Sequence, residues 1–229
     1  MSGRLCHEAQ GQAPRTATRV IAIDGPASSG KSTLARALAE HLGVARLDTG
    51  AMYRAVAYCA LARGIDPGDD PAVAALARGL VLDLGERLRV DGTDATDAIR
   101  TPEVDAAVSV VAANPEVRAE MVARQRAWVA HHGGGVVEGR DIGTVVLPDA
   151  QLKIYLTAST DERARRRALE RAGDDLGAVA KALARRDRLD STRAASPLPA
   201  PQDMAADAVV IDSTGRDAAE VLGEVLGWL

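Results

Sequence analysis

The sequence predicts an α/β fold of three layers, in which a five-stranded parallel sheet lies between helices. First, short apolar segments begin near residues 20, 44, 135, 152 and 208 and alternate with helical patterns, which is typical of a parallel sheet. Second, 47% of the 229 residues are hydrophobic, enough for a sizeable core. Third, this length suits one domain with a small inserted lobe.

A glycine-rich turn joins the first predicted strand, Val20–Asp24, to a helix whose leucines recur at helical spacing until Gly43. A turn in this position is typical of a phosphate-binding P-loop, because its N–H groups and the helix N-terminus face one anion. The flanking strand and helix argue against a chance turn, so we expect the P-loop NTPase fold. Lys31 is expected to reach the outer phosphates of ATP and Ser32 to bind Mg²⁺. The predicted ATP-binding turn comprises Gly25, Pro26, Ala27, Ser28, Ser29, Gly30, Lys31, Ser32 and Thr33.

The pattern changes between residues 65 and 113. Capping residues precede prolines at Asp70-Pro71, Thr101-Pro102 and Asn114-Pro115, which predicts three helix starts. Segments 80–84, 87–90 and 93–99 are separated by Gly-Glu and Asp-Gly turns and read as a small antiparallel meander. We therefore expect a small α+β lobe inserted into the core.

The remaining segments resume the alternation. After the second strand a helix is expected to run to Gly64, and a later helix to about His132. Further strands are expected at 135–138, 152–156 and 208–211, a loop at 139–144, and helices at about 160–171, 175–188 and 216–229. The predicted units are a disordered extension (1–18), a P-loop core (19–64 and 114–229, with a short helical lid at about 160–190) and the inserted lobe (65–113).

Composition excludes several classes of function. The net charge of −4 and the pI of about 5.6 argue against general nucleic-acid binding. The longest apolar runs are shorter than the ~18 residues that span a membrane, and residues 1–18 lack the apolar region of a secretory signal. Cys6 and Cys59 form no metal-binding or redox spacing. A monomer in the reducing cytoplasm is therefore expected, with no membrane partner.

Two arginines follow predicted strands at the edge where a ligand is expected. Arg54 follows the second core strand and Arg140 the third, and loops at the carboxyl ends of parallel strands converge on one crevice. Arginines that clamp donor and acceptor are expected where a phosphoryl group moves between two anions. The polar triplet Gly139-Arg140-Asp141 between two apolar strands is therefore interpreted as functional.

Other polar residues carry weaker signals. His131-His132 lacks a third ligand, and a helix C-terminus favours His through the helix dipole. Asp24 and Asp48 end the first two strands, and each could order water around Mg²⁺ or cap the following turn. The arginines after residue 160 alternate with acidic residues, so part of that helix is a solvated face with i,i+4 ion pairs.

The chain contains four motifs, Gly25–Thr33, Leu47–Arg54, Glu138–Thr144 and Asp190–Arg193. In this order, and with the long insertion between them, they resemble the motifs of bacterial cytidylate kinases. The resemblance covers nearly everything from Val20 to the C-terminus. It implies transfer of the γ-phosphoryl group of ATP to CMP or dCMP, with Mg²⁺, and identifies the insertion as a monophosphate-binding lobe.

The resemblance also implies roles for individual residues. Arg54 and Arg140, helped by Arg193, would bind the acceptor phosphate, and Lys31, Arg140 and Arg193 would act in catalysis. A carboxylate can accept from the exocyclic amine of cytosine while Arg and Ser donate to its ring acceptors. The expected acceptor site comprises Thr49, Tyr53, Arg54, Ser109, Arg118, Arg140, Asp141, Arg186, Asp190 and Arg193, with Ser109, Arg118 and Asp141 on the base and Arg186 and Asp190 on the sugar. Arg163 and Arg167, one turn apart, are the lid arginines expected to contact ATP.

Two alternatives remain at this point. The first is a P-loop kinase for another small acceptor, such as UMP, a different nucleoside monophosphate or a hydroxyl metabolite. The second is a regulator or motor that hydrolyses ATP to change its partners. The sequence offers the second little support, because it contains no extra partner domain and no basic stripe outside the predicted lid.

Overall fold

The computed structural model describes residues 19–85, 87–170, 175–193, 197–201, 204 and 207–229. The N-terminal extension predicted for residues 1–18 lies outside these ranges. None of the helices within them is both long enough and apolar enough to cross a membrane.

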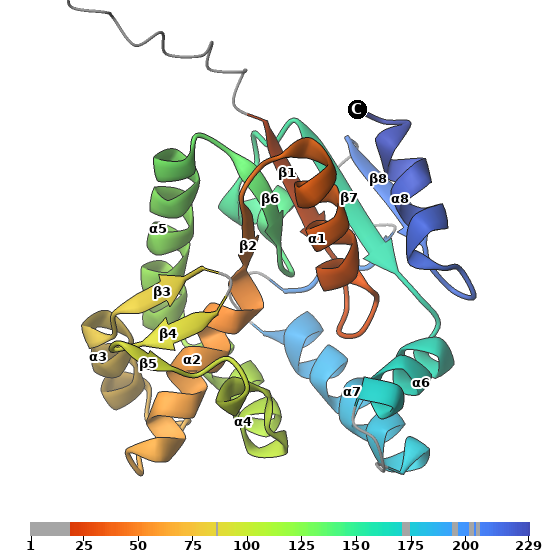
Figure 1. Ribbon diagram of the computed structural model, residues 1–229. Coiled ribbons are helices and arrows are strands. Elements are labelled where there is room, and N and C mark those ends of the chain that lie inside the picture. The colour runs from red at the N-terminus through yellow and green to blue at the C-terminus, as the bar shows by residue number, and fades with distance from the viewer. Residues whose placement is uncertain (1–18, 86, 171–174, 194–196, 202–203, 205–206) are drawn as a thin grey trace, which may run out of the picture.

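A five-stranded, wholly parallel sheet forms the middle layer, as predicted (Figure 1). Its strand order is β2-β6-β1-β7-β8. The central strand aligns Ile23 with Glu138 on one side and with Ile154 on the other. This order puts the P-loop next to the carboxyl ends of both neighbours. The strands are β1 (Val20–Asp24), β2 (Arg46–Asp48), β6 (Gly135–Glu138), β7 (Leu152–Thr157) and β8 (Ala208–Asp212).

Helices cover both faces of the sheet, and the alternation of side chains along β1 explains how. Ile21 and Ile23 pack with Leu38 of α1 (Lys31–Leu42) and Val221 of α8 (Ala218–Leu226). Ala22 points to the opposite face, where α2 (Thr49–Ala62) and α5 (Pro115–His132) contribute to a second core cluster. The last helix is shorter than the predicted 216–229.

The segment between α2 and α5 forms the predicted three-stranded antiparallel meander and two helices. Thr101 and Asn114 cap their helices as predicted, whereas Asp69, not Asp70, caps the first one. The third strand stops at Asp94, well short of the predicted 99. The elements are α3 (Asp70–Gly79), β3 (Leu82–Leu84), β4 (Leu88–Val90), β5 (Thr93–Asp94), the 3₁₀ helix η1 (Ala98–Arg100) and α4 (Pro102–Ala113).

Helix α2 packs against α3, α4 and η1, and α3 packs against α5. These elements lie together beside the sheet in Figure 1. The inserted segment therefore shares a core with helices on either side of it in the chain, and the boundaries at 65 and 113 stay a prediction.

Two helices in the predicted lid region, α6 (Thr160–Glu170) and α7 (Leu176–Thr192), pack against each other. Helix α7 runs four residues beyond the predicted end at 188 and also packs against α4, so it carries Asp190 on its last turns. The loop predicted at 139–144 differs too, because Ile142–Val146 forms one π-helical turn.

Candidate active site

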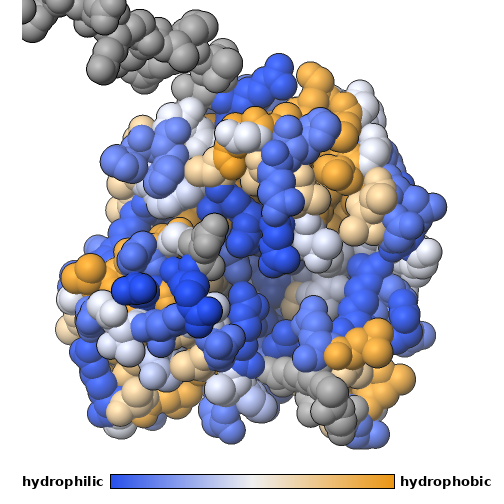
Figure 2. All heavy atoms as spheres, in the orientation of Figure 1, coloured by the Kyte–Doolittle hydropathy of each residue, from blue (hydrophilic) through white to orange (hydrophobic). Residues whose placement is uncertain are grey.

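A cavity of about 890 Å³ opens between the P-loop, α2, α4 and α7. Figure 2 shows a central hollow bordered by hydrophilic residues. Side chains from the carboxyl ends of β2 and β6 reach the same cavity, as expected for a parallel sheet. The lining combines polar groups from segments that lie far apart in the sequence.

The P-loop owes its shape to two glycines with positive φ. Gly25 has φ 145°, and a Cβ there would lie 2.0 Å from the carbonyl oxygen of Leu156. Gly30, in the left-handed region, caps α1. This leaves the helix N-terminus without a side-chain cap, which is the arrangement that accepts an anion.

Lys31 folds back over the loop, and its Nζ donates to the carbonyl oxygen of Pro26 at 2.6 Å. Burial, and then the nearby Arg140 guanidinium, lower the pKa of Lys31 to about 7. A phosphate beside Nζ would reverse this effect, since an anion stabilises the ammonium form. The local electrostatics therefore favour an anionic ligand at the loop.

Ser32 lies beside the carboxylate of Glu138, which is paired in register with Asp48, and all three residues line the cavity. Its Oγ donates to Oε2 of Glu138 at 2.7 Å, and Arg46 donates to Oε1 at 3.0 Å. Burial and the adjacent Asp48 raise the pKa of Glu138 to about 7. A hydroxyl and two carboxylates are oxygen donors that suit a hydrated Mg²⁺. No group of three or more His, Cys, Asp or Glu that could hold a metal alone occurs in the described part of the chain.

Asp48 caps the following turn, one of the two alternatives that the sequence left open, whereas Asp24 instead holds a turn far away in the chain. The oxygens of Asp24 accept from the N–H groups of Ile142 and Gly143 at 2.7 and 2.8 Å. Asp48 accepts from the N–H of Ala51 and so begins α2. Burial raises the pKa of Asp24 to about 6.

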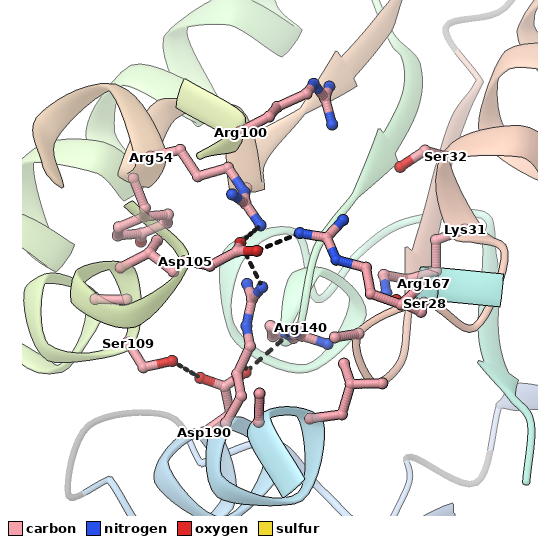
Figure 3. A pocket seen from close by; sticks show the side chains of 18 of the residues that line it. Ser28, Lys31, Ser32, Arg54, Arg100, Asp105, Ser109, Arg140, Arg167 and Asp190 are labelled. Carbon is pink, nitrogen blue, oxygen red and sulfur yellow. Dashed lines mark hydrogen bonds and ion pairs between the residues drawn. The ribbon is translucent and has the colours of Figure 1, made fainter. Parts of the chain in front are cut away.

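Asp105, on the first turn of α4, gathers arginines from three helices (Figure 3). Its carboxylate accepts hydrogen bonds from Arg54 of α2 and Arg167 of α6. The guanidinium of Arg186 on α7 lies 3.6 Å from the same group. Arg54 is further held by the carbonyl oxygen of Ile99 at 3.1 Å.

A second cluster centres on Asp190 of α7. Arg140 pairs with it at 3.1 Å and donates to the carbonyl oxygen of Gly25 in the P-loop at 2.6 Å. The hydroxyl of Ser109 donates to the other oxygen of Asp190 at 3.1 Å. Burial alone would raise the pKa of Asp190, but the arginines around it hold the pKa below its ordinary value.

A buried ion pair also lines the cavity. Arg118 of α5 donates to Asp141, and both residues are 5% exposed. Arg193 approaches the second oxygen of Asp141 at 3.7 Å. The guanidinium of Arg118 also lies 6.0 Å from the centre of the Tyr53 ring, a cation–π distance. This part of the cavity therefore offers a carboxylate, guanidinium groups and an aromatic face.

The structure brings all ten residues expected for the acceptor to this one cavity. Arg167 and most of the P-loop also line it, while Gly25, Pro26 and Ser29 do not. Arg163 is absent from the lining. Its guanidinium is buried between Asp187, at 2.6 Å, and the carbonyl oxygen of Ala27, at 3.3 Å, so the structure gives no support to a direct contact with ATP.

The sequence analysis missed several lining residues. Asp105 is the most important, and an acid in the first turn of a helix ordinarily signals only dipole stabilisation.

A second cavity of about 590 Å³ lies on the other side of the P-loop. There Arg166 donates to Ser213 and to the carbonyl oxygen of Ser29. Arg36 and Arg100 also line the main cavity.

Comparisons with known proteins agree with this geometry. The family model described as "Cytidylate kinase" matches residues 21–228. A cytidylate kinase from Desulfitobacterium hafniense is 50% identical over 214 residues, which are 90% of this chain and 90% of that protein. A bifunctional pantoate ligase/cytidylate kinase from a Synechococcus strain is 52% identical over 194 residues, 80% of this chain but 39% of that longer protein.

Solved structures support the fold. A gluconokinase from Sinorhizobium meliloti has a TM-score of 0.50 at 16% identity, with 93% of this chain and 92% of that chain covered. At this identity the likeness concerns the fold alone. The family match and the relatives reach further, and they show that the chain belongs to the cytidylate kinase family and is a nucleoside monophosphate kinase.

Proposed function

We propose that this protein transfers the γ-phosphoryl group of ATP to CMP or dCMP, giving CDP or dCDP, with Mg²⁺ bound beside the P-loop. The observation that carries the proposal is the buried Arg118–Asp141 pair, which lies in the same cavity as Lys31. A P-loop alone fits many reactions, whereas a buried carboxylate in the same cavity suits an acceptor with an amino group.

The base would be read by hydrogen bonds of opposite polarity. Asp141 would accept from the exocyclic amine of cytosine, while Arg118 and Ser109 would donate to its ring acceptors. Uracil presents a carbonyl where cytosine has its amine, so a uracil in this position would put one acceptor against another at Asp141. Buried groups left unpaired by the wrong substrate are a strong source of discrimination.

The acceptor phosphate would lie among Arg54, Arg140 and Arg193, with Thr49 and Tyr53 on the wall of the same pocket. Arg140 bonds the P-loop backbone and Asp190 together, so it is fixed between the two nucleotides. Asp190 and Arg186 would hold the sugar hydroxyls. Arg167 would reach the phosphates of the donor.

The donor nucleoside would occupy the second cavity, because that cavity shares Ser28, Gly30 and Thr33 with the lining of the first. Bound Mg²⁺ would neutralise charge on the triphosphate. Ser32 would hold it, with Glu138 and Asp48 accepting from its water shell. Lys31 and the arginines would stabilise charge on the moving phosphoryl group during in-line transfer.

Water must stay out of such a site, since it would otherwise compete with the acceptor. Helices α6 and α7 would act as the lid, and the segment 65–113 as the acceptor lobe. Helix α7 packs against α4 in this structure, and closure of both parts would hold these two helices over the substrates. We further propose that the protein is a monomer and acts in the cytoplasm, where ATP and CMP are available.

An acceptor panel tests this function. Formation of ADP from ATP is followed with CMP, dCMP, UMP, AMP or GMP, and without an acceptor. The proposal expects ADP to appear with CMP and dCMP and to be near background otherwise. A preference for another monophosphate would point to the alternative kinase, and ADP formation without an acceptor would point to an ATPase.

A further inference from the structure

Asp105 occupies an unusual position for a carboxylate. It lies between the guanidinium groups of Arg54, Arg167 and Arg186, which come from three separate helices. Figure 3 shows Arg54 and Arg167 converging on Asp105 inside the cavity. Its side chain is 18% exposed, so the cluster is largely shielded from water.

The charges explain why an anion is needed at this point. Desolvation and the proximity of another arginine lower the pKa of Arg54. Desolvation and two neighbouring arginines lower the pKa of Arg186 to about 9. Burial alone would raise the pKa of Asp105, but the three guanidinium groups outweigh burial and hold the pKa below its ordinary value. The carboxylate is therefore a fixed negative charge in a cluster of positive ones.

We propose that Asp105 is a positioning residue that stands in for a phosphate group. Its two oxygens hold the arginines of the lid and of α2 in a convergent arrangement until the nucleotide phosphates take over Arg54 and Arg167. Guanidinium groups pair with carboxylates and with phosphates in the same bidentate geometry, so one anion can replace the other without rebuilding the cluster.

This role couples substrate binding to closure, and it rests on the proposed function only for the identity of the phosphate. Asp105 belongs to α4, whereas Arg167 and Arg186 belong to the two lid helices. Their contacts therefore join the acceptor side of the cavity to the lid. Without the carboxylate, the repulsion among the arginines would favour separation of these two sides.

The test measures the distance between the two sides by double electron–electron resonance. Spin labels are attached at Val81→Cys and Leu176→Cys, both exposed and outside the cavity, in a Cys6→Ser background. The variants are Asp105→Asn, Asp105→Glu and, as a matched control, Asp94→Asn. Asp94 pairs with Arg87 on the exposed meander, away from the cavity.

In nucleotide-free protein, Asp105→Asn should shift the distances to longer and broader values, while Asp105→Glu and Asp94→Asn should match the reference. Adding CMP with a non-hydrolysable ATP analogue, or inorganic pyrophosphate alone, should return Asp105→Asn to the short distance. Thermal unfolding checks that each variant is folded.

Two results would overturn the proposal. Identical distances for Asp105→Asn and the reference without nucleotide would show that the carboxylate does not hold the two sides together. An Asp105→Asn protein that stays open with pyrophosphate and with both nucleotides would show a structural role that phosphate cannot replace. Neither result depends on turnover, so a failed acceptor panel remains distinguishable from a failed stand-in role.

Discussion

The substitution Asp141→Asn should weaken the preference for CMP over UMP without dismantling the site. Asparagine has nearly the same size as aspartate but no charge. Asp141 is 5% exposed and bonds to Arg118, so the variant keeps a polar group in the same place. Its oxygen can still accept from Arg118, which leaves the NH₂ group facing the base, where it can donate to the carbonyl of uracil but cannot accept from the amine of cytosine.

The expected magnitude follows from the hydrogen bond that is lost. A hydrogen bond to a charged group contributes about 1.5–3 kcal/mol, and each 1.4 kcal/mol is about tenfold in kcat/KM. The kcat/KM for CMP should therefore fall about 10–150-fold. UMP should lose far less, since the amide can donate to its carbonyl, and the CMP/UMP ratio should fall at least about tenfold.

The assay is coupled ADP formation with CMP and with UMP at several acceptor concentrations. Asp190→Asn is the matched control, because Asp190 is equally buried and also pairs with an arginine of the cavity. Its proposed contact is with the sugar, so both acceptors should lose activity together. A wild-type CMP/UMP ratio in correctly folded Asp141→Asn would refute base reading by Asp141.

Stability separates this role from that of a buried counter-ion. Asp141→Ala leaves the guanidinium of Arg118 buried without its carboxylate, and removal of one partner of a buried ion pair costs about 3–5 kcal/mol. We therefore expect a much lower midpoint of denaturant unfolding for Asp141→Ala than for Asp141→Asn. Equal midpoints would contradict this account of the pair.

Three further substitutions test the donor side and the core. Lys31→Met should lower kcat by at least about 10²–10³-fold with unchanged thermal unfolding, and near-normal turnover would exclude the assigned role. EDTA should abolish turnover, and Ser32→Ala should raise the Mg²⁺ concentration for half-maximal activity about tenfold or more; an unchanged Mg²⁺ dependence would remove Ser32 as a ligand. Burial raises the pKa of Asp24 from 3.8 to about 6, so ionisation of Asp24 destabilises the wild-type fold. This loss of stability is absent below pH 3.8 and reaches about 3 kcal/mol above pH 6. The melting temperature of Asp24→Asn relative to wild type should therefore rise between pH 4 and 7, and a constant difference would contradict the shift.

The parts of the fold that depend on local sequence could be predicted. The P-loop is contiguous, and its glycines, strand and helix all follow from neighbouring residues. The caps at Thr101 and Asn114 are local in the same sense. The predicted ends of helices are less accurate. Helix α7 continues to Thr192 because it packs against α4 and α6, and the periodicity within α7 does not reveal these contacts.

Side-chain partners across the chain could not be predicted. Arg163 and Arg167 are one turn apart, yet one is buried against Asp187 and the other reaches the cavity. Both faces of α6 carry charges, so the hydrophobic pattern does not say which face meets the cleft. Asp105 is separated by 51 residues from Arg54 and by 62 from Arg167, and nothing near it in sequence marks that meeting.

Three carboxylates balance the arginines of the cavity, but they are not equivalent. Asp141 and Asp190 have proposed contacts with the base and the sugar, so they would keep a role while a nucleotide is bound. Asp105 has no such contact, and its partners include two arginines of the lid. The phosphates of the bound nucleotides can therefore replace Asp105 at Arg54 and Arg167 while the other two carboxylates hold the acceptor. This division of labour explains why a site that must attract anions also contains fixed negative charge: without it, guanidinium groups crowded into one low-dielectric cavity would repel one another before the substrate arrived.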